Sequence, residues 1–304
     1  MMEYITLNNG VEMPVIGNGP LSLEDAMKGK YRHTNDIVGK IWYKFVQQPI
    51  AASDYVNSVA NAFRVGFNLI DYSSGYGSGV LIGKAIRKSG IPREKLFLTT
   101  KVNPVWQVKN KVRECVEMQL KNFGVDYFDL VLLHWPVTDC YLDNWRELEQ
   151  LYKEGVCRAI GVANCHQHHL ESISEISDVV PAVNQIEVHP LLTQKSLIKY
   201  CQDKGIVIES YTPIARNDDR LVRIPALKLI AQKYHKSVIQ VILRWQVQNG
   251  CVPIVRALNK KHQASNLDIF DFTLTQEEMK DIDGFNINSR LRFDPDNVDF
   301  KIFY

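Results

Sequence analysis

The strongest constraint in this sequence is a regular alternation between short apolar runs and longer amphipathic segments. The short runs are rich in β-branched residues and are typical of buried strands. Their bounds are Pro14–Gly19, Asn68–Ser73, Leu96–Val102, Asp129–Trp135, Ala159–Asn164, Ala182–Val188, Ile206–Pro213 and Cys251–Ala257. The intervening segments carry apolar residues at helical spacing, for example Val56, Val59, Ala60 and Phe63. Strands that alternate with helices predict parallel strands joined by right-handed crossovers. Eight such units predict an α/β fold of the (β/α)₈ TIM-barrel class, with an open doubly wound sheet as the alternative.

Three segments fall outside this alternation. Residues Ile5–Met13 predict an N-terminal β-hairpin that turns at Asn9-Gly10, a strong turn pair. Residues 20–52 form an insertion that is long for a strand-to-helix loop, and residues 284–304 form a C-terminal tail without clear periodicity. The insertion contains the aromatic residues Tyr31, Trp42, Tyr43 and Phe45. We expect these side chains to form a small core, or alternatively a lid that faces the substrate.

Composition excludes several classes of partner. The chain has 304 residues and a net charge of +2, which favours neither nucleic acid nor an anionic membrane surface. No apolar run approaches the roughly 18 residues of a membrane span, and the first residues lack the pattern of a signal peptide. The six cysteines form no C-x-x-C pair. We therefore expect a cytoplasmic protein with buried, free thiols.

Polar side chains stand at the carboxyl ends of consecutive predicted strands. They are Asp71, Lys101, His134, Asn164, Gln185 and Tyr211. In a (β/α)₈ barrel these strand ends meet around one mouth, where catalytic groups are found. Any one of these residues alone could have a structural role, but six at equivalent positions predict a shared site at that mouth.

Four residues of the predicted site suit the protonation of a carbonyl oxygen. The phenol of Tyr76 is a weak acid, with an ordinary pKa of about 10, and an ammonium such as Lys101 nearby favours its phenolate form. Asp71 would pair with Lys101 and keep it charged despite burial, and His134 would orient the carbonyl group. Because no side chain donates a hydride, reduction at this site requires a cofactor.

Longer motifs around these residues resemble the aldo-keto reductase family, in its bacterial form. The matching segments are Asp71-Tyr-Ser-Ser-Gly-Tyr76, Thr100-Lys101, Leu132-Leu-His134-Trp135-Pro136, Ile160-Gly-Val-Ala-Asn164, Asn184-Gln185-Ile-Glu-Val-His-Pro190 and Pro14-Val-Ile-Gly17-Asn-Gly19. They occur in the family's order along nearly the whole chain. The resemblance implies one barrel domain over residues 1–304 that reduces a small-molecule carbonyl substrate, with Tyr76 as the proton donor.

The resemblance also implies a nicotinamide cofactor, NADPH, with NADH as the other possibility. Asn164 and Gln185 would hold its carboxamide, and Tyr211 would stack on the nicotinamide ring. Arg256 would bind the 2′-phosphate and Asn266 the adenine. No motif specifies the carbonyl substrate or the oligomeric state.

Two alternatives to this function remain open, and the first follows from departures from the family pattern. Ala163 and Ala257 replace hydroxyl residues that contact the cofactor in the family. They favour, as an alternative, a catalytically weak nucleotide-binding regulatory protein on the same barrel. The second alternative is a lyase that forms a Schiff base on Lys101.

A histidine cluster follows the fifth predicted strand. His166, His168 and His169 lack a fourth partner and the orderly spacing of zinc ligands. We therefore expect a solvated helix start and no metal.

Overall fold

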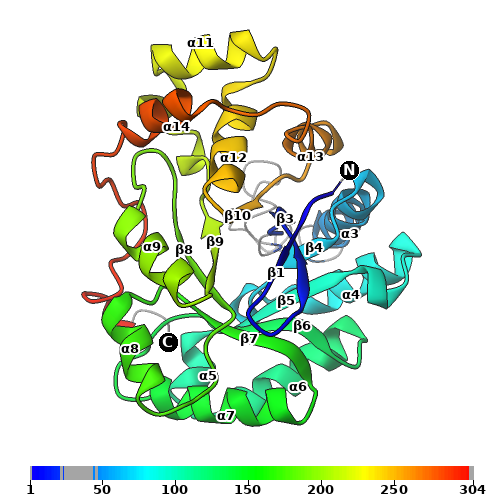
Figure 1. The fold of residues 1–304 in the computed structure, drawn as a ribbon. Helices are drawn as coiled ribbons and strands as arrows, with labels where there is room; N and C mark the ends of the chain where they lie inside the picture. Colours follow the sequence, from blue (N-terminus) through cyan, green and yellow to red (C-terminus); the bar gives the residue numbers. More distant parts are fainter. Residues whose placement is uncertain (1, 21–22, 24–43, 45–46, 301–304) are drawn as a thin grey trace, which may run out of the picture.

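Eight parallel strands close into a barrel, as the sequence predicts. The structure is a computed structural model that describes residues 2–20, 23, 44 and 47–300 (Figure 1). The barrel strands are β3 (Gly17–Asn18), β4 (Leu69–Asp71), β5 (Phe97–Val102), β6 (Phe128–Leu133), β7 (Cys157–Ala163), β8 (Val183–Glu187), β9 (Val207–Tyr211) and β10 (Cys251–Val255). They follow chain order around the barrel, and β10 pairs with both β9 and β3. This closure excludes the doubly wound sheet.

Helices surround the barrel (Figure 1). The helices are α3 (Gln48–Val65), α4 (Gly79–Ser89), α5 (Pro104–Gln107), α6 (Val112–Phe123), α7 (Tyr141–Lys153), α8 (Gln167–Ser174), α9 (Lys195–Asp203), α10 (Asp219–Val222), α11 (Pro225–Lys233), α12 (Val238–Gln248), α13 (Lys260–Leu267) and α14 (Gln276–Asp283), with short 3₁₀ helices at Ser74–Tyr76, Arg93–Lys95 and Ala215–Asn217. The apolar spacing predicted for this segment is confirmed in α3, since Val59, Ala60 and Phe63 are buried. Apolar spacing therefore indicated correctly which face of this helix packs inward.

The N-terminal hairpin closes the amino end of the barrel. Strands β1 (Tyr4–Thr6) and β2 (Glu12–Pro14) pair in an antiparallel arrangement around the turn that contains Gly10. Leu7 and Met13 pack in one apolar cluster with side chains of the barrel strands, including Phe97, Val183 and Val207 at the amino ends of their strands. Because the hairpin covers this end, the opposite, carboxyl end of the barrel is left for a site.

Most of the predicted strand boundaries are wrong by one to three residues, and the differences in the first barrel strand, β6 and β7 have clear consequences or causes. The first barrel strand is limited to Gly17–Asn18, because Pro14 pairs within the hairpin instead. Strand β6 ends at Leu133, so His134 lies just after it. Strand β7 ends at Ala163, because Asn164 has a φ of 61°, a left-handed conformation that ends an extended ladder.

The predicted insertion also ends earlier than expected. Residues 48–52 form the first turns of α3, where Pro49 occupies a favourable position near the helix start. The residues expected to form an aromatic core or lid lie outside the described residues. They are Tyr31, Trp42, Tyr43 and Phe45.

The C-terminal tail lies across the carboxyl end of the barrel. The carboxylate of Glu187 at the end of β8 accepts hydrogen bonds from the backbone N–H groups of Leu291 at 2.8 Å and Arg292 at 3.0 Å. The ring of Phe300 packs against Trp135 with 6.2 Å between ring centroids. The tail thereby contributes to the rim of the mouth, and it runs beside α8 (Figure 1).

The cysteine prediction is confirmed, with one difference. Five of the six free thiols are buried, while Cys140 is half-buried beside the start of α7. Among the helices that the structure describes, none combines the length and hydrophobicity that a bilayer span requires.

Candidate active site

A buried ion pair lies at the centre of the carboxyl end of the barrel. The Nζ of Lys101, in β5, is 2.5 Å from both carboxylate oxygens of Asp71, the last residue of β4. Both side chains are almost fully buried. Burial lowers the pKa of Lys101, but the neighbouring Asp71 and Tyr76 outweigh it, and the net effect raises this pKa. Lys101 is therefore a stable ammonium in the folded protein.

Tyr76 lies beside this pair. It ends the 3₁₀ helix that directly follows β4, and Gly77 ends that helix with a φ of 68° that suits glycine. The Nζ of Lys101 is 6.0 Å from the centroid of the Tyr76 ring. The ring of Tyr72 packs edge-to-face against the half-buried Tyr76 ring, with 5.6 Å between the ring centroids. The arrangement brings a phenol and an ammonium to the same mouth.

His134 is held by a serine that the sequence analysis did not select. Nδ1 of His134 is 3.0 Å from Oγ of Ser73, and this oxygen also accepts a hydrogen bond from the backbone N–H of Gly75 at 3.4 Å. The hydroxyl proton of Ser73 can then point to Nδ1, which leaves the proton of the neutral ring on Nε2. Burial, followed by the charges of Lys101 and Arg292, holds the pKa of His134 well below its usual value. The imidazole is neutral near pH 7 as a result.

A second residue that the sequence analysis missed is Glu209. The Nε2 of Gln185 donates hydrogen bonds to Oδ1 of Asp71 at 3.0 Å and to Oε2 of Glu209 at 2.7 Å. Burial and the negative charge of Asp71 raise the pKa of Glu209 to about 8, against the opposing effects of Gln185 and Lys101. A carboxylate that directly follows the apolar pair Val207 and Ile208 in a predicted buried strand was the signal in the sequence that could have identified this residue.

Asn164 and Tyr211 meet at the same end of the barrel. The hydroxyl of Tyr211 donates to Oδ1 of Asn164 at 2.7 Å, and Nδ2 of Asn164 donates to the backbone oxygen of His134 at 3.0 Å. Among the described residues, one N–H of Asn164 is left without an acceptor, and Gln185, whose two N–H groups are used, keeps its Oε1 as an acceptor. This donor and this acceptor suit the carbonyl oxygen and one N–H of a primary carboxamide, so these residues fit the amide of a nicotinamide.

The remaining two predicted residues lie further along the chain. Arg256 is exposed on the segment that follows β10, and Asn266 is buried in α13. Gln263 ties α13 to this segment, because its Nε2 donates to the backbone oxygen of Ala257 at 2.9 Å. The structure thus brings Arg256 and Asn266 onto connected segments beyond the last strand, apart from the hydrogen-bonded group around Lys101.

Comparisons with known proteins agree with this fold. The family model described as "Aldo/keto reductase family" matches residues 39–287. An uncharacterized oxidoreductase, YtbE, of Bacillus subtilis is 40% identical over 302 residues, covering 97% of each chain. A glyoxal reductase of the same organism is 38% identical and covers 99% of each chain. The crystal structure of a Bombyx mori aldo-keto reductase in complex with NADP has a TM-score of 0.82 and 30% identity, covering 97% of this chain and 96% of that one. The chain therefore belongs to the aldo/keto reductase family of NAD(P)H-dependent oxidoreductases.

Proposed function

We propose that this protein reduces an aldehyde or ketone to an alcohol with NADPH, and that Tyr76 donates the proton. The observation that carries the proposal is the buried pair of Lys101 and Asp71 next to the Tyr76 ring, with 2.5 Å between Nζ and the carboxylate and 6.0 Å between Nζ and the ring centroid. A cation fixed beside a phenol is the arrangement that makes tyrosine a useful acid near neutral pH.

The proton transfer follows from the charges at the site. The ammonium of Lys101 stabilises the phenolate that remains after Tyr76 gives its proton to the carbonyl oxygen. Asp71 binds Nζ with both oxygens, so the ammonium keeps its place and its charge in a buried setting. The phenolate regains a proton from solvent at the half-buried mouth, which completes the cycle for this residue.

His134 would orient the substrate in this scheme. Its neutral ring, with Nδ1 held by Ser73, presents Nε2–H as a donor to the carbonyl oxygen. A neutral imidazole is a weaker acid than Tyr76 assisted by Lys101, so we assign it to positioning rather than to proton donation.

The cofactor would be held by Asn164, Gln185 and Tyr211. Bound NADPH supplies a hydride to the carbonyl carbon, while the proton of Tyr76 goes to the oxygen. The spare N–H of Asn164 and the Oε1 of Gln185 suit the two ends of the carboxamide. Arg256 would take the 2′-phosphate, because a guanidinium binds phosphate with paired hydrogen bonds, and Asn266 would contact the adenine. The NADP in the silkworm structure supports this choice over NADH.

The structure disfavours Schiff-base chemistry at Lys101. An amine nucleophile needs a lowered pKa so that its lone pair is available at neutral pH. The pKa of Lys101 is raised instead, and Asp71 binds its ammonium directly. Reduction is therefore the better assignment for this lysine.

The test follows NADPH absorbance with small reactive aldehydes, including glyoxal because of the glyoxal reductase relative. Tyr76→Phe should lower the rate by about 10²–10⁴-fold, the usual contribution of a positioned proton donor. Tyr127→Phe is a matched control, because Tyr127 stacks on Arg93 before β6, at the amino end of the barrel. Equal rates for wild type and Tyr76→Phe would reject the assigned donor. Tight NADPH binding without reduction of any carbonyl would favour a regulatory nucleotide-binding protein.

A further inference from the structure

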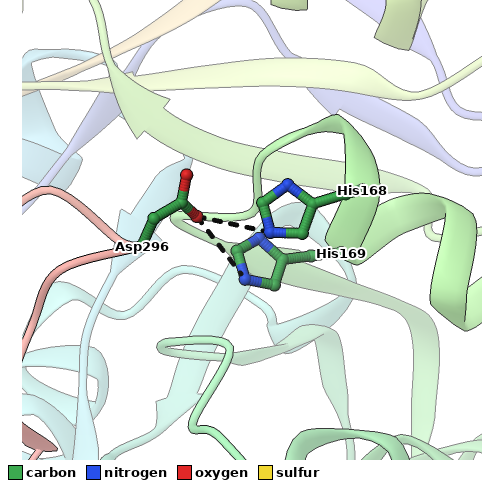
Figure 2. A group of neighbouring side chains, drawn as sticks. All are labelled: His168, His169 and Asp296. Carbon is green, nitrogen blue, oxygen red and sulfur yellow. Dashed lines mark ion pairs between the residues drawn. The ribbon is translucent and has the colours of Figure 1, made fainter.

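Three histidines from the middle of the chain and an aspartate from its C-terminal tail meet beside the barrel mouth. His166 immediately precedes α8, and His168 and His169 lie in its first turn. Asp296 comes from the tail, 130 residues after His166. Figure 2 shows the carboxylate of Asp296 pointing at the rings of His168 and His169, with both contacts made by the same oxygen. The tail thus provides the additional partner that the histidine cluster lacks in the sequence.

The distances within this cluster suit a metal ion. Oδ1 of Asp296 lies 3.3 Å from Nε2 of His168 and 3.8 Å from Nε2 of His169. One ligand atom of each residue lies within 4.8 Å of the others. A tetrahedral zinc ion with bonds of about 2.0–2.1 Å separates its ligand atoms by about 3.3 Å. The 3.3 Å contact already matches this separation, and the 3.8 Å contact would have to shorten by about 0.5 Å when an ion binds.

The chemistry of the donors selects the kind of ion. Two imidazoles and one carboxylate are ligands of zinc and of neighbouring transition metals, and such a set leaves a position for water. Magnesium and calcium prefer oxygen ligands, of which His168 and His169 offer none. A borderline divalent ion is therefore favoured over a hard one.

Two further hydrogen bonds affect this site: one supports the carboxylate of Asp296, and the other limits the affinity for a metal ion. Nδ1 of His166 lies 2.8 Å from Oδ2 of Asp296, so it can orient the oxygen that does not face the other rings. Nδ1 of His169 accepts the backbone N–H of His166 at 3.1 Å. Binding of an ion at Nε2 would place the ring proton on Nδ1 and break this hydrogen bond. The site should consequently bind more weakly than a preformed structural zinc site.

We propose that His168, His169 and Asp296 form a binding site for a divalent transition-metal ion such as Zn²⁺. The ion joins α8 to the tail, which also contacts Glu187 through Leu291 and Arg292. Its binding therefore restrains the tail segment at the rim of the mouth. This site is separate from the reduction chemistry and stands whether or not the proposed function is correct.

The experiment measures Zn²⁺ binding to the full chain by calorimetric titration in a non-chelating buffer. The protein is prepared without a histidine tag, which would itself bind Zn²⁺. We expect one equivalent to bind to wild type, and His168→Ala and Asp296→Asn to weaken binding at least tenfold. Asp296→Asn keeps the size of the side chain, so it tests the site even if His168→Ala folds poorly. His235→Asn is the matched control and should bind like wild type, because His235 is an exposed histidine in a left-handed turn that asparagine tolerates.

Three outcomes would overturn the proposal. They are the absence of saturable Zn²⁺ binding to wild type, equal binding by wild type and Asp296→Asn, and equal binding of Mg²⁺ and Zn²⁺ to wild type. The restraint on the tail has its own readout in hydrogen exchange. Zn²⁺ should slow exchange of the amides of residues 291–300 in wild type and His235→Asn, and leave Asp296→Asn unchanged. Binding without this protection would contradict the link between α8 and the tail.

Discussion

The amide nitrogen of Gln185 donates a 2.7 Å hydrogen bond to Oε2 of Glu209, its register partner on the neighbouring strand. Glu209 is fully buried, and its other oxygen, Oε1, has no hydrogen-bond partner among the described residues. Burial, together with the charge of Asp71, raises the pKa of Glu209 to about 8. One buried ammonium, Lys101, thus balances one carboxylate, Asp71, while Glu209 is mainly protonated at neutral pH.

This ionisation makes stability depend on pH. The folded protein holds a proton on Glu209 up to about pH 8, whereas the unfolded chain releases it near the ordinary value of 4.5. The stabilising contribution is therefore complete below pH 4.5 and is lost as the pH rises toward 8. Glu209→Gln cannot ionise, so its melting temperature should rise relative to wild type between pH 5 and pH 8. Thermal unfolding of both proteins at several pH values in this window checks the prediction. A difference that stays constant with pH would contradict it.

Removing one partner of the central ion pair should be costly. Asp71→Asn leaves the buried Lys101 charged and without its carboxylate, which should destabilise the protein by about 3–5 kcal/mol. The double variant Asp71→Asn/Lys101→Met removes both charges and should recover part of this loss while it stays inactive. Urea unfolding combined with the NADPH assay separates the two effects. If the double variant is no more stable than the single one, the unpaired charge is not the cause.

Ser73 should act through His134. Ser73→Ala removes the oxygen that lies 3.0 Å from Nδ1, so the imidazole can take other orientations and tautomers. We expect kcat for the carbonyl substrate to fall about three- to tenfold, in line with the loss of one hydrogen bond, while NADPH affinity is unchanged. Ser89→Ala, at the end of α4, removes a serine hydroxyl that, among the described residues, bonds the backbone of Ile86 and Ile91, and it serves as the control. A loss of NADPH affinity with unchanged kcat would assign Ser73 to the cofactor instead.

Arg256 should decide the preference between the two nicotinamide cofactors. Arg256→Ala removes the guanidinium proposed to bind the 2′-phosphate, and charge-assisted hydrogen bonds of this kind are worth about 1.5–3 kcal/mol. We therefore expect NADPH binding to weaken about ten- to hundredfold and NADH binding to stay the same. Fluorescence titration with each cofactor measures both constants. Equal losses for NADPH and NADH would show that Arg256 does not contact the phosphate.

Local patterns were sufficient to predict the barrel. A short apolar run indicates a strand that is buried on both faces, and an amphipathic segment indicates a helix that is buried on one face. Both patterns are carried by residues close together in the chain. The hairpin around Gly10 is also local, and it is confirmed. The convergence of Asp71 and Lys101 followed from the fold, because carboxyl ends of parallel strands lie on the same side.

The sequence by itself determined the fold class and the end of the barrel where polar strand-end residues gather. Only the tertiary structure decided that Ser73 contacts His134, that Gln185 joins Asp71 to Glu209, and that Asp296 reaches His168. These contacts depend on strand register, on closure of the barrel and on the path of a tail without periodicity. No short-range pattern encodes them, since each pairs groups that become neighbours only after the chain has folded.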